Sequence, residues 1–334
     1  MKVFISGIAG FLGSHIADRM IRNGHEVIGC DNLIGGYLDN VPDQAEFHQV
    51  DCGYLNTMVK LTKGCDIVYH TACTAYEGLS VFSPHLISKN SYQITATMLS
   101  AAISNRVKRF VYCSSMARYG QQETVPFREE MECKPQDPYG IAKYAGELLV
   151  KNLCQVHGID YVIAVPHNII GPRQKYDDPF RNVASIMVNL MLQKRQPIIY
   201  GDGTQKRCFS YVNDVIYCLE RLALDRSIKS EVFNIGPDEE FITINELARL
   251  IEDKLNFKLD PIYVPARPQE VTLATCSADK ARKRLGYHTK VTLSEGMDHM
   301  IEYIRARGPK KFRYHLDVEI INEKCPRTWI DRLF

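Results

Sequence analysis

The sequence predicts an α/β protein: a Rossmann-type, doubly wound parallel sheet with a smaller C-terminal α/β substrate lobe. Short β-rich runs alternate with helical patterns over the first half of the chain, and this order implies right-handed βαβ crossovers and a parallel sheet. The strands are almost wholly apolar, as expected for a sheet that is buried on both faces. After residue 165 the sequence pattern changes to loops with Gly, Pro and clustered charge, which suit a ligand-facing lobe.

The first half of the chain supplies the strands and helices of a nucleotide-binding sheet. Each expected strand is a short apolar run rich in β-branched or aromatic residues, and each expected helix carries a helical apolar pattern. In chain order we expect strand 2–6 (KVFIS), helix 11–23, strand 26–30 (EVIGC), a third strand before Asp51, strand 66–70 (DIVYH), helix 89–105 and strand 109–113 (RFVYC).

The second half completes the sheet and builds the lobe. Asp137 and Pro138 are typical of an N-cap and first turn, so a helix should begin there, followed by strands 160–165 and 231–235. The lobe should contain a helix over about 182–194 and two helices that begin at capping boxes. These boxes are Thr243-x-x-Glu246 and Thr292-x-x-Glu295.

We predict two domains from this order. Residues 1–165 form the domain of the parallel sheet, to which 205–240 returns, and residues 166–204 and 241–334 form the substrate lobe. The tail 308–334 holds the single tryptophan, Trp329. Its aromatic residues indicate that the tail docks on the protein, but the sequence does not say where.

Composition narrows the class of protein. The chain has 334 residues, of which 24% are charged, and its 41 Lys and Arg nearly balance its 39 Asp and Glu. This balance argues against an electrostatic nucleic-acid or membrane binder. The 11 cysteines have no Cys-x-x-Cys pair, which favours reduced thiols in the cytoplasm and gives no metal-ligand spacing. We find no leader, no membrane span and no metal site.

A glycine motif follows the first strand and opens the first helix. Such glycines permit a tight turn and let backbone N–H groups at the helix N-terminus approach a pyrophosphate. The alternative is a turn with a purely structural role. The sequence GIAGFLG predicts dinucleotide contacts from Gly7, Gly10, Phe11, Leu12 and Gly13.

The residues after the second strand favour NAD over NADP. Asp31 ends this strand and Asn32 follows. A carboxylate here can accept hydrogen bonds from the adenosine ribose hydroxyls, and it would repel a ribose 2′-phosphate. Asp51 and Cys52, after the third strand, are placed to flank the adenine.

A serine, a tyrosine and a lysine form the candidate catalytic group. Ser115 follows the strand RFVYC, at the sheet edge where open α/β proteins bind ligands. Tyr139 and Lys143 lie at i and i+4 on one helix face, where an ammonium would stabilise a phenolate. The alternative is a serine-rich turn before an ordinary amphipathic helix.

With these motifs in place, the chain resembles the extended short-chain dehydrogenase/reductase family, and in particular nucleotide-sugar epimerases of the UDP-glucose 4-epimerase type. The resemblance covers residues 1 to about 307. It depends on GIAGFLG, the DN at 31–32, CSSMARYG, DPYGIAK, HNIIGPRQ, YGDGTQKRCFSYVNDV and PARPQEV.

The resemblance implies a role for each site residue. Ser115, Tyr139 and Lys143 would be catalytic, with Tyr139 and Lys143 also contacting NAD. Further NAD contacts would come from Thr71, Ala72, Asn90 and His167. The nucleotide diphosphate of the substrate would be held by Asn168, Arg207 and Arg267, and the substrate would also contact Ser115 and Tyr200.

The function implied by the resemblance is NAD-dependent inversion of carbon 4 in a nucleotide-diphosphate sugar through a transient 4-keto intermediate. The sugar could be UDP-glucose or galactose, a UDP-N-acetylhexosamine or a uronate, and UDP itself is a family expectation. The resemblance also implies a homodimer through helices near 89–105 and 139–157.

Departures from the family pattern leave alternatives open. Sugar 4,6-dehydratases carry an Asp-Glu pair where this chain has Met116 and Ala117, which cannot transfer a proton. Val165, Ile170 and Cys208 also depart from the pattern and could alter the hexose pocket. The alternatives are a dehydratase, decarboxylase or 4-ketoreductase of the same family, or an inactive Rossmann binding module, against which the intact Ser-Tyr-Lys group argues.

Overall fold

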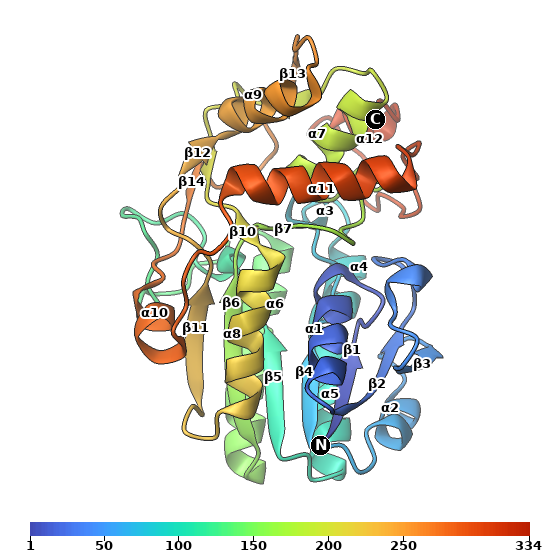
Figure 1. The fold of residues 1–334 in the computed structure, drawn as a ribbon, viewed down its shortest axis with the longest axis vertical. Helices are drawn as coiled ribbons and strands as arrows, with labels where there is room; N and C mark the ends of the chain where they lie inside the picture. Colours follow the sequence, from blue (N-terminus) through green and yellow to red (C-terminus); the bar gives the residue numbers. More distant parts are fainter.

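A seven-stranded parallel sheet forms the base of the molecule (Figure 1). The computed structural model describes residues 1–334. The strand order is β11-β6-β5-β4-β1-β2-β3, so the chain winds in both directions away from β1. The fold class predicted from the sequence is therefore confirmed. The strands are β1 (Lys2–Ser6), β2 (Glu26–Asp31), β3 (Glu46–Gln49), β4 (Ile67–His70), β5 (Arg109–Cys113), β6 (Asp160–Pro166) and β11 (Glu231–Ile235).

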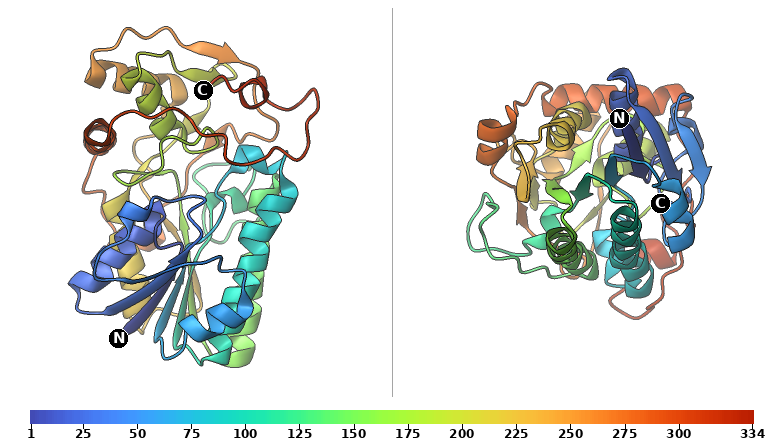
Figure 2. Two further views of the ribbon diagram at one scale, coloured as in Figure 1. Left: turned by 90° about the vertical axis from the view of Figure 1, so that its right-hand side faces the viewer. Right: turned by 90° about the horizontal axis from the view of Figure 1, so that it is seen from below.

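Helices cover both faces of this sheet. On one face, α1 (Phe11–Arg22) lies beside α8 (Val212–Leu224). The other face carries α2 (Leu55–Leu61), α5 (Ile94–Ser104) and α6 (Pro138–His157). Figure 2 shows α5 and α6 side by side along the sheet. Because both faces are covered, the strands β1, β4, β5 and β6 are buried almost throughout, as the apolar sequence predicts.

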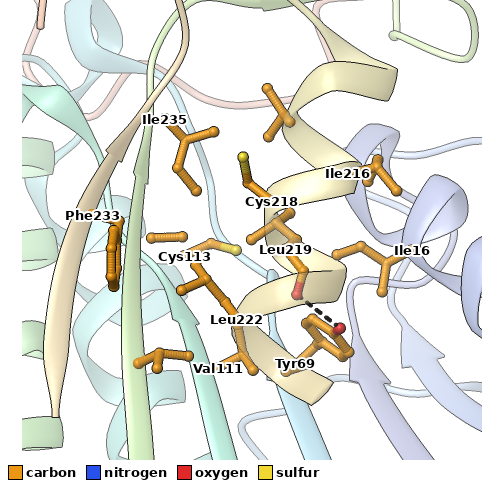
Figure 3. Packing of buried hydrophobic residues seen from close by; sticks show 14 of the residues in the cluster. Ile16, Tyr69, Val111, Cys113, Ile216, Cys218, Leu219, Leu222, Phe233 and Ile235 are labelled. Atoms are coloured by element: carbon orange, nitrogen blue, oxygen red, sulfur yellow. Dashed lines mark hydrogen bonds between the residues drawn. The ribbon is translucent and has the colours of Figure 1, made fainter. Parts of the chain in front are cut away.

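Alternate strand residues enter two separate apolar layers. Val111 and Phe233 pack toward α1 and α8, together with Leu219 and Leu222 of α8 (Figure 3). The Tyr69 hydroxyl, buried in the same layer, donates to the Leu219 carbonyl oxygen at 3.1 Å. This bond gives the buried phenol an oxygen acceptor, as buried polar groups require.

The second part of the chain forms a lobe above the carboxyl ends of the strands (Figure 1). Its helices are α7 (Val183–Leu192), α9 (Ile244–Leu255) and α11 (Leu293–Arg307), which share one apolar cluster. Both predicted capping boxes are present at the starts of α9 and α11. Small sheets complete the lobe: β8 (Ile198–Tyr200) with β13 (Ile262–Val264), β9 (Lys206–Arg207) with β12 (Ile242–Thr243) and β14 (Leu273–Ala274), and β7 (Ile169–Ile170) with β10 (Ser210–Tyr211).

One helix of the expected lobe lies with the large sheet instead. α10 (Asp279–Leu285) packs against β11 and α8, because Ala281 and Leu285 belong to the apolar layer of the sheet. β9, within the segment expected to return to the sheet, pairs with lobe strands. The domain boundaries remain a prediction, and the chain crosses between the two parts more often than we expected.

The helix expected over 89–105 begins earlier. α4 (Pro84–Ser88) leads through a π-helical turn, η2 (Lys89–Gln93), into α5. Pro84 occupies the first turn after Ser83, where a proline loses no hydrogen bond. The remaining short helices are η1 (Leu38–Asn40), α3 (Glu77–Ser80), η3 (Met116–Arg118) and α12 (Arg327–Ile330).

The tail 308–334 crosses from the lobe to the sheet domain. Figure 2 shows it passing in front of the space between the two parts. Trp329 packs between Phe82 and Phe180, with ring centroids 6.1 and 5.4 Å away. Glu319 accepts hydrogen bonds from the His85 and Leu86 backbone N–H groups at the start of α4. The docking predicted from the tail's aromatic residues therefore occurs, and it joins both parts of the chain.

None of the helices is both long enough and apolar enough to cross a membrane. The 11 cysteines form no disulfide.

Candidate active site

A cleft lies between the carboxyl ends of the strands and the lobe. It collects all of the residues that the sequence predicted for cofactor, catalysis and substrate except His167. These are Gly7, Gly10, Phe11, Leu12, Gly13, Asp31, Asn32, Asp51, Cys52, Thr71, Ala72, Asn90, Ser115, Tyr139, Lys143, Asn168, Tyr200, Arg207 and Arg267.

The glycine loop is built for close approach of a ligand to the backbone. Gly7 has a φ of +79°, and a Cβ there would lie 2.9 Å from the Ala72 Cα. A Cβ on Gly13 would overlap the Gly7 carbonyl oxygen, so α1 can pack tightly against the loop only with glycine. Gly10 is the N-cap of α1 and has no capping side chain. The first N–H groups of the helix therefore point into the cleft, where a pyrophosphate would bind.

Asp31 also holds the glycine loop in place. Its carboxylate accepts hydrogen bonds from the Ala9 N–H at 3.0 Å and the Leu33 N–H at 2.7 Å. Burial raises the pKa of Asp31, whereas the backbone hydrogen bonds lower it. Nearby, Asn32 Nδ2 donates to Asp51 Oδ2 at 3.0 Å. These carboxylates form the acidic end of the cleft, where ribose hydroxyls could bind and a further phosphate would be repelled.

Ser115, Tyr139 and Lys143 meet at the sheet edge. Ser115 follows β5 and accepts a hydrogen bond from the Ala117 N–H at 3.2 Å. Asp137 caps α6 by accepting from the Gly140 N–H at 2.9 Å, as predicted, and this fixes the first turn that carries Tyr139. Lys143 Nζ donates to the Cys113 carbonyl oxygen at 2.7 Å and lies 6.0 Å from the centre of the Tyr139 ring.

Burial and charge act in opposite directions on Tyr139. Burial raises the pKa of the Tyr139 phenol well above its ordinary value, and the positive charge of Lys143 lowers it. Burial also opposes the charged form of Lys143, but Cys73, Tyr112 and Tyr139 raise its pKa, and the net shift is upward. Lys143 thus acts on the phenol in the direction that the sequence predicted. Without a ligand, however, burial dominates and the phenol is protonated.

The lobe side of the cleft contributes two arginines that share one carboxylate. Arg267 donates from Nε and Nη2 to Glu270 at 3.2 and 3.0 Å, and Arg207 Nη2 lies 3.5 Å from the same residue. The Arg267 guanidinium also lies over the Tyr200 ring, 4.7 Å from its centre. Tyr200 in turn is held by Thr328 of the tail through a hydroxyl contact of 2.5 Å. These contacts fix the orientation of both arginines.

Two other residues predicted from the sequence, Asn168 and His167, already have hydrogen-bond partners within the protein. Asn168 lines the cleft, but its amide donates to the Cys208 carbonyl oxygen at 2.9 Å. His167 is buried outside the cleft lining, and its Nε2 pairs with the Pro237 carbonyl oxygen at 2.9 Å. The geometry therefore gives no support to His167 as a cofactor contact. His167 directly follows β6, and its ring lies against Gly236 in the interior of the protein.

The residues that depart from the family pattern fall into two groups: some line the cleft and others are buried away from it. Met116 and Ala117 line the cleft, where they offer no proton-transferring group. Val165, Ile170 and Cys208 are buried and do not line it. Their side chains therefore make no direct contact with a ligand in the cleft, and their effect on the hexose pocket stays a prediction.

Sequence reasoning missed several residues of the cleft. Glu77 and Glu270 both line it, although neither was singled out. For Glu270 a signal existed, since it lies within the quoted PARPQEV segment beside Arg267. Gly36, which packs against the glycine loop without lining the cleft, was missed as well: a Cβ there would overlap the Ala9 carbonyl oxygen, and the adjacent glycines 35 and 36 could have indicated this close approach.

The fold and the cleft together define a class of protein: a Rossmann-fold enzyme that binds a dinucleotide beside a Ser-Tyr-Lys group. The family model described as the NAD dependent epimerase/dehydratase family matches residues 3–236. The chain therefore belongs to this family, and its cofactor is NAD. The residues fit this cofactor, because the glycine loop leaves room for a pyrophosphate and Asp31 stands at the ribose end.

Three relatives show the range of the family. The crystal structure of a UDP-glucose 4-epimerase from Thermotoga maritima with UDP-glucose is 31% identical, with a TM-score of 0.88, covering 92% of this chain and 99% of that chain. A UDP-glucose 4-epimerase from Mycolicibacterium smegmatis is 28% identical over 92% of this chain and all of its own. A GDP-mannose 3,5-epimerase from Arabidopsis thaliana is 31% identical, covering 96% and 86%.

Replacing Asp31 should weaken the discrimination against NADP. In Asp31→Ala the repulsion of a ribose 2′-phosphate is lost, so the ratio of NADPH to NADH dissociation constants should fall by about tenfold. NADH affinity should also fall, because the anchors of Ala9 and Leu33 are lost. Fluorescence titration with both nucleotides measures the ratio, with Asp51→Ala as the control that should change it less. Equal affinity of the wild type for both would refute this assignment.

Proposed function

We propose that the protein inverts carbon 4 of a nucleotide-diphosphate sugar, with UDP as the nucleotide, through a transient 4-keto sugar. The observation that carries this proposal is the arrangement of the cleft. A Ser-Tyr-Lys group stands beside the dinucleotide loop, and two arginines face it from the lobe. Relatives that act on UDP-sugars support the nucleotide.

In the proposed mechanism, this chain's residues move one proton and hold the substrate. The positive charges of Lys143 and of bound NAD would favour the Tyr139 phenolate, which takes the proton of the sugar 4-hydroxyl while Ser115 hydrogen-bonds the same oxygen. Bound in its oxidised form, NAD supplies a hydride acceptor and a positive charge at its nicotinamide ring. Lys143 holds the cofactor's ribose and keeps the Tyr139 pKa lower than burial alone would set it. Tyr139 then returns the proton to the new 4-hydroxyl.

The substrate must turn over between the two half-reactions. Arg207 and Arg267 hold the diphosphate as a fixed pivot, since charge-assisted hydrogen bonds are strong and directional. The sugar itself is then held loosely enough to present its other face. Met116 and Ala117 argue against elimination of water, because neither can transfer a proton.

We also propose a homodimer through α5 and α6. These helices pack side by side; Ile141 and Leu148 of α6 are exposed, as is Tyr92 of the turn η2 that leads into α5. Apolar residues gathered on an outer helix face favour an interface. A cytoplasmic location remains the prediction made from the cysteines.

The test is the fate of hydrogen at carbon 4. UDP-glucose deuterated at carbon 4 should give UDP-galactose that retains the label, because the hydrogen removed is the one returned. NMR of the product, with other UDP- and GDP-sugars as a substrate panel, measures this directly. Solvent deuterium at carbon 3 or 5 would contradict the proposal and indicate enolisation beside the ketone. Release of water or carbon dioxide would indicate a dehydratase or decarboxylase.

A further inference from the structure

The cleft contains one carboxylate that the proposed mechanism does not use. Glu77, the first residue of α3, lines the cleft with an exposed side chain, and its carboxylate makes no hydrogen bond or ion pair. The other carboxylates on this side are engaged. Glu270 is held by Arg267, and Asp137 caps α6. Glu77 is therefore free to meet a ligand.

The position of α3 places Glu77 beside the sugar. At one end of α3, Ser80 Oγ donates to Asp137 Oδ1 at 3.2 Å, which ties this helix to the start of the catalytic helix α6. In its middle, a Cβ on Gly78 would lie 3.0 Å from Arg267 Nη1. Glu77 begins this short helix, so it lies near both the start of the catalytic helix and the arginine assigned to the diphosphate, and the charges of Asp137 and Arg267 both act on it. A nucleotide sugar places its hexose between these two points.

On the basis of the proposed function, we propose that Glu77 selects the sugar: it favours a neutral hexose and rejects a hexuronate. A carboxylate can accept hydrogen bonds from sugar hydroxyls, whereas two carboxylates sharing a site disfavour each other's ionised form. Arg207 and Arg267 offset only part of the Glu77 charge, because both also contact Glu270 and, in the proposed function, bind the substrate diphosphate. Of the three sugar classes that the sequence left open, this proposal removes the uronate and keeps the two neutral hexose classes.

The rejection should depend on pH. Glu77 is solvent-accessible but lies deep in the cleft, and loss of surrounding water raises its pKa to about 7. This net pKa already includes the Asp137 and Glu270 carboxylates, which raise it, and Arg207 and Arg267, which lower it. Below pH 7, Glu77 is neutral and a uronate meets no charge there. Above pH 7, Glu77 must take up a proton to admit a uronate, which costs about tenfold in affinity per pH unit.

The experiment compares two ligands by calorimetry on the NAD-loaded enzyme between pH 6.5 and 8.5. The probes are UDP-glucose and UDP-glucuronate. The readout is the dissociation constant of UDP-glucuronate divided by that of UDP-glucose. In the wild type this ratio should rise about tenfold per pH unit above 7. In Glu77→Gln it should be small and independent of pH. Glu77→Asp keeps the charge and should keep the slope.

The ratio isolates Glu77 from other titrating groups, since both probes carry the same diphosphate. Thermal melting checks that Glu77→Gln is folded, and no partner is lost because Glu77 has none. Equal affinity for both sugars in the wild type at pH 8.5 would overturn the inference, as would a slope that persists in Glu77→Gln. If UDP-glucose binds well in that case, the proposed function survives. A wild type that binds neither UDP-sugar overturns both.

Discussion

Turnover of the nucleotide sugar should fall roughly 100- to 10,000-fold in Tyr139→Phe, the range that general acid–base catalysis typically contributes. The substitution removes only the hydroxyl oxygen. The ring stays buried, 5% exposed in the wild type, so its packing is retained. Affinity for the nucleotide sugar should change little, because the arginines that hold the diphosphate lie on the lobe side of the cleft. Steady-state kinetics and calorimetry separate the two effects.

Tyr144→Phe provides the matched control on the same helix. Tyr144 is half-buried near Arg118, with its ring 5.7 Å from the guanidinium, and it does not line the cleft. Its variant should turn over within about threefold of the wild type, as surface substitutions usually have small effects. If Tyr139→Phe retained full turnover with bound NAD, the proton acceptor would have to be another group of the cleft.

The residues whose position in the cleft could be predicted from the sequence are those marked by local patterns. The glycine loop, Asp31 and the Asp137 cap each depend on neighbours within a few residues along the chain. Their geometry follows from turn chemistry and helix capping. The placement of Tyr139 and Lys143 follows in the same way from helical spacing.

The residues that were missed are placed by contacts between distant segments. Glu77 lies in a four-residue helix, too short to leave a periodic signal. Its position in the cleft depends on Ser80 meeting Asp137 and on Arg267 lying over Gly78. The docking of Trp329 against Phe82 and Phe180 is another contact of this kind. No pattern within either segment alone could have predicted these positions.

Arg267→Ala should weaken binding of UDP and UDP-sugars by roughly ten- to a hundredfold, because charge-assisted hydrogen bonds contribute on the order of 1.5 to 3 kcal/mol. Arg267 uses Nε and Nη2 for Glu270, whereas its Nη1, beside Gly78, has no hydrogen-bond partner in the protein. This free group can donate to a phosphate oxygen. Arg207→Ala should act in the same direction, and calorimetry with UDP measures both. NAD affinity should stay close to that of the wild type.

Glu270 allows a second test of whether Arg267 binds the diphosphate. The charge of Arg267 lowers the pKa of Glu270 against the effect of burial, so Arg267→Ala leaves an ionised carboxylate with Arg207 alone. That carboxylate would repel the incoming diphosphate and add to the loss. Adding Glu270→Gln to Arg267→Ala should therefore restore about tenfold of the affinity, a coupling expected for residues in direct contact. If the double variant binds UDP no better than Arg267→Ala, Glu270 does not act on the diphosphate. Unchanged UDP affinity in both arginine variants would show that neither arginine binds the diphosphate.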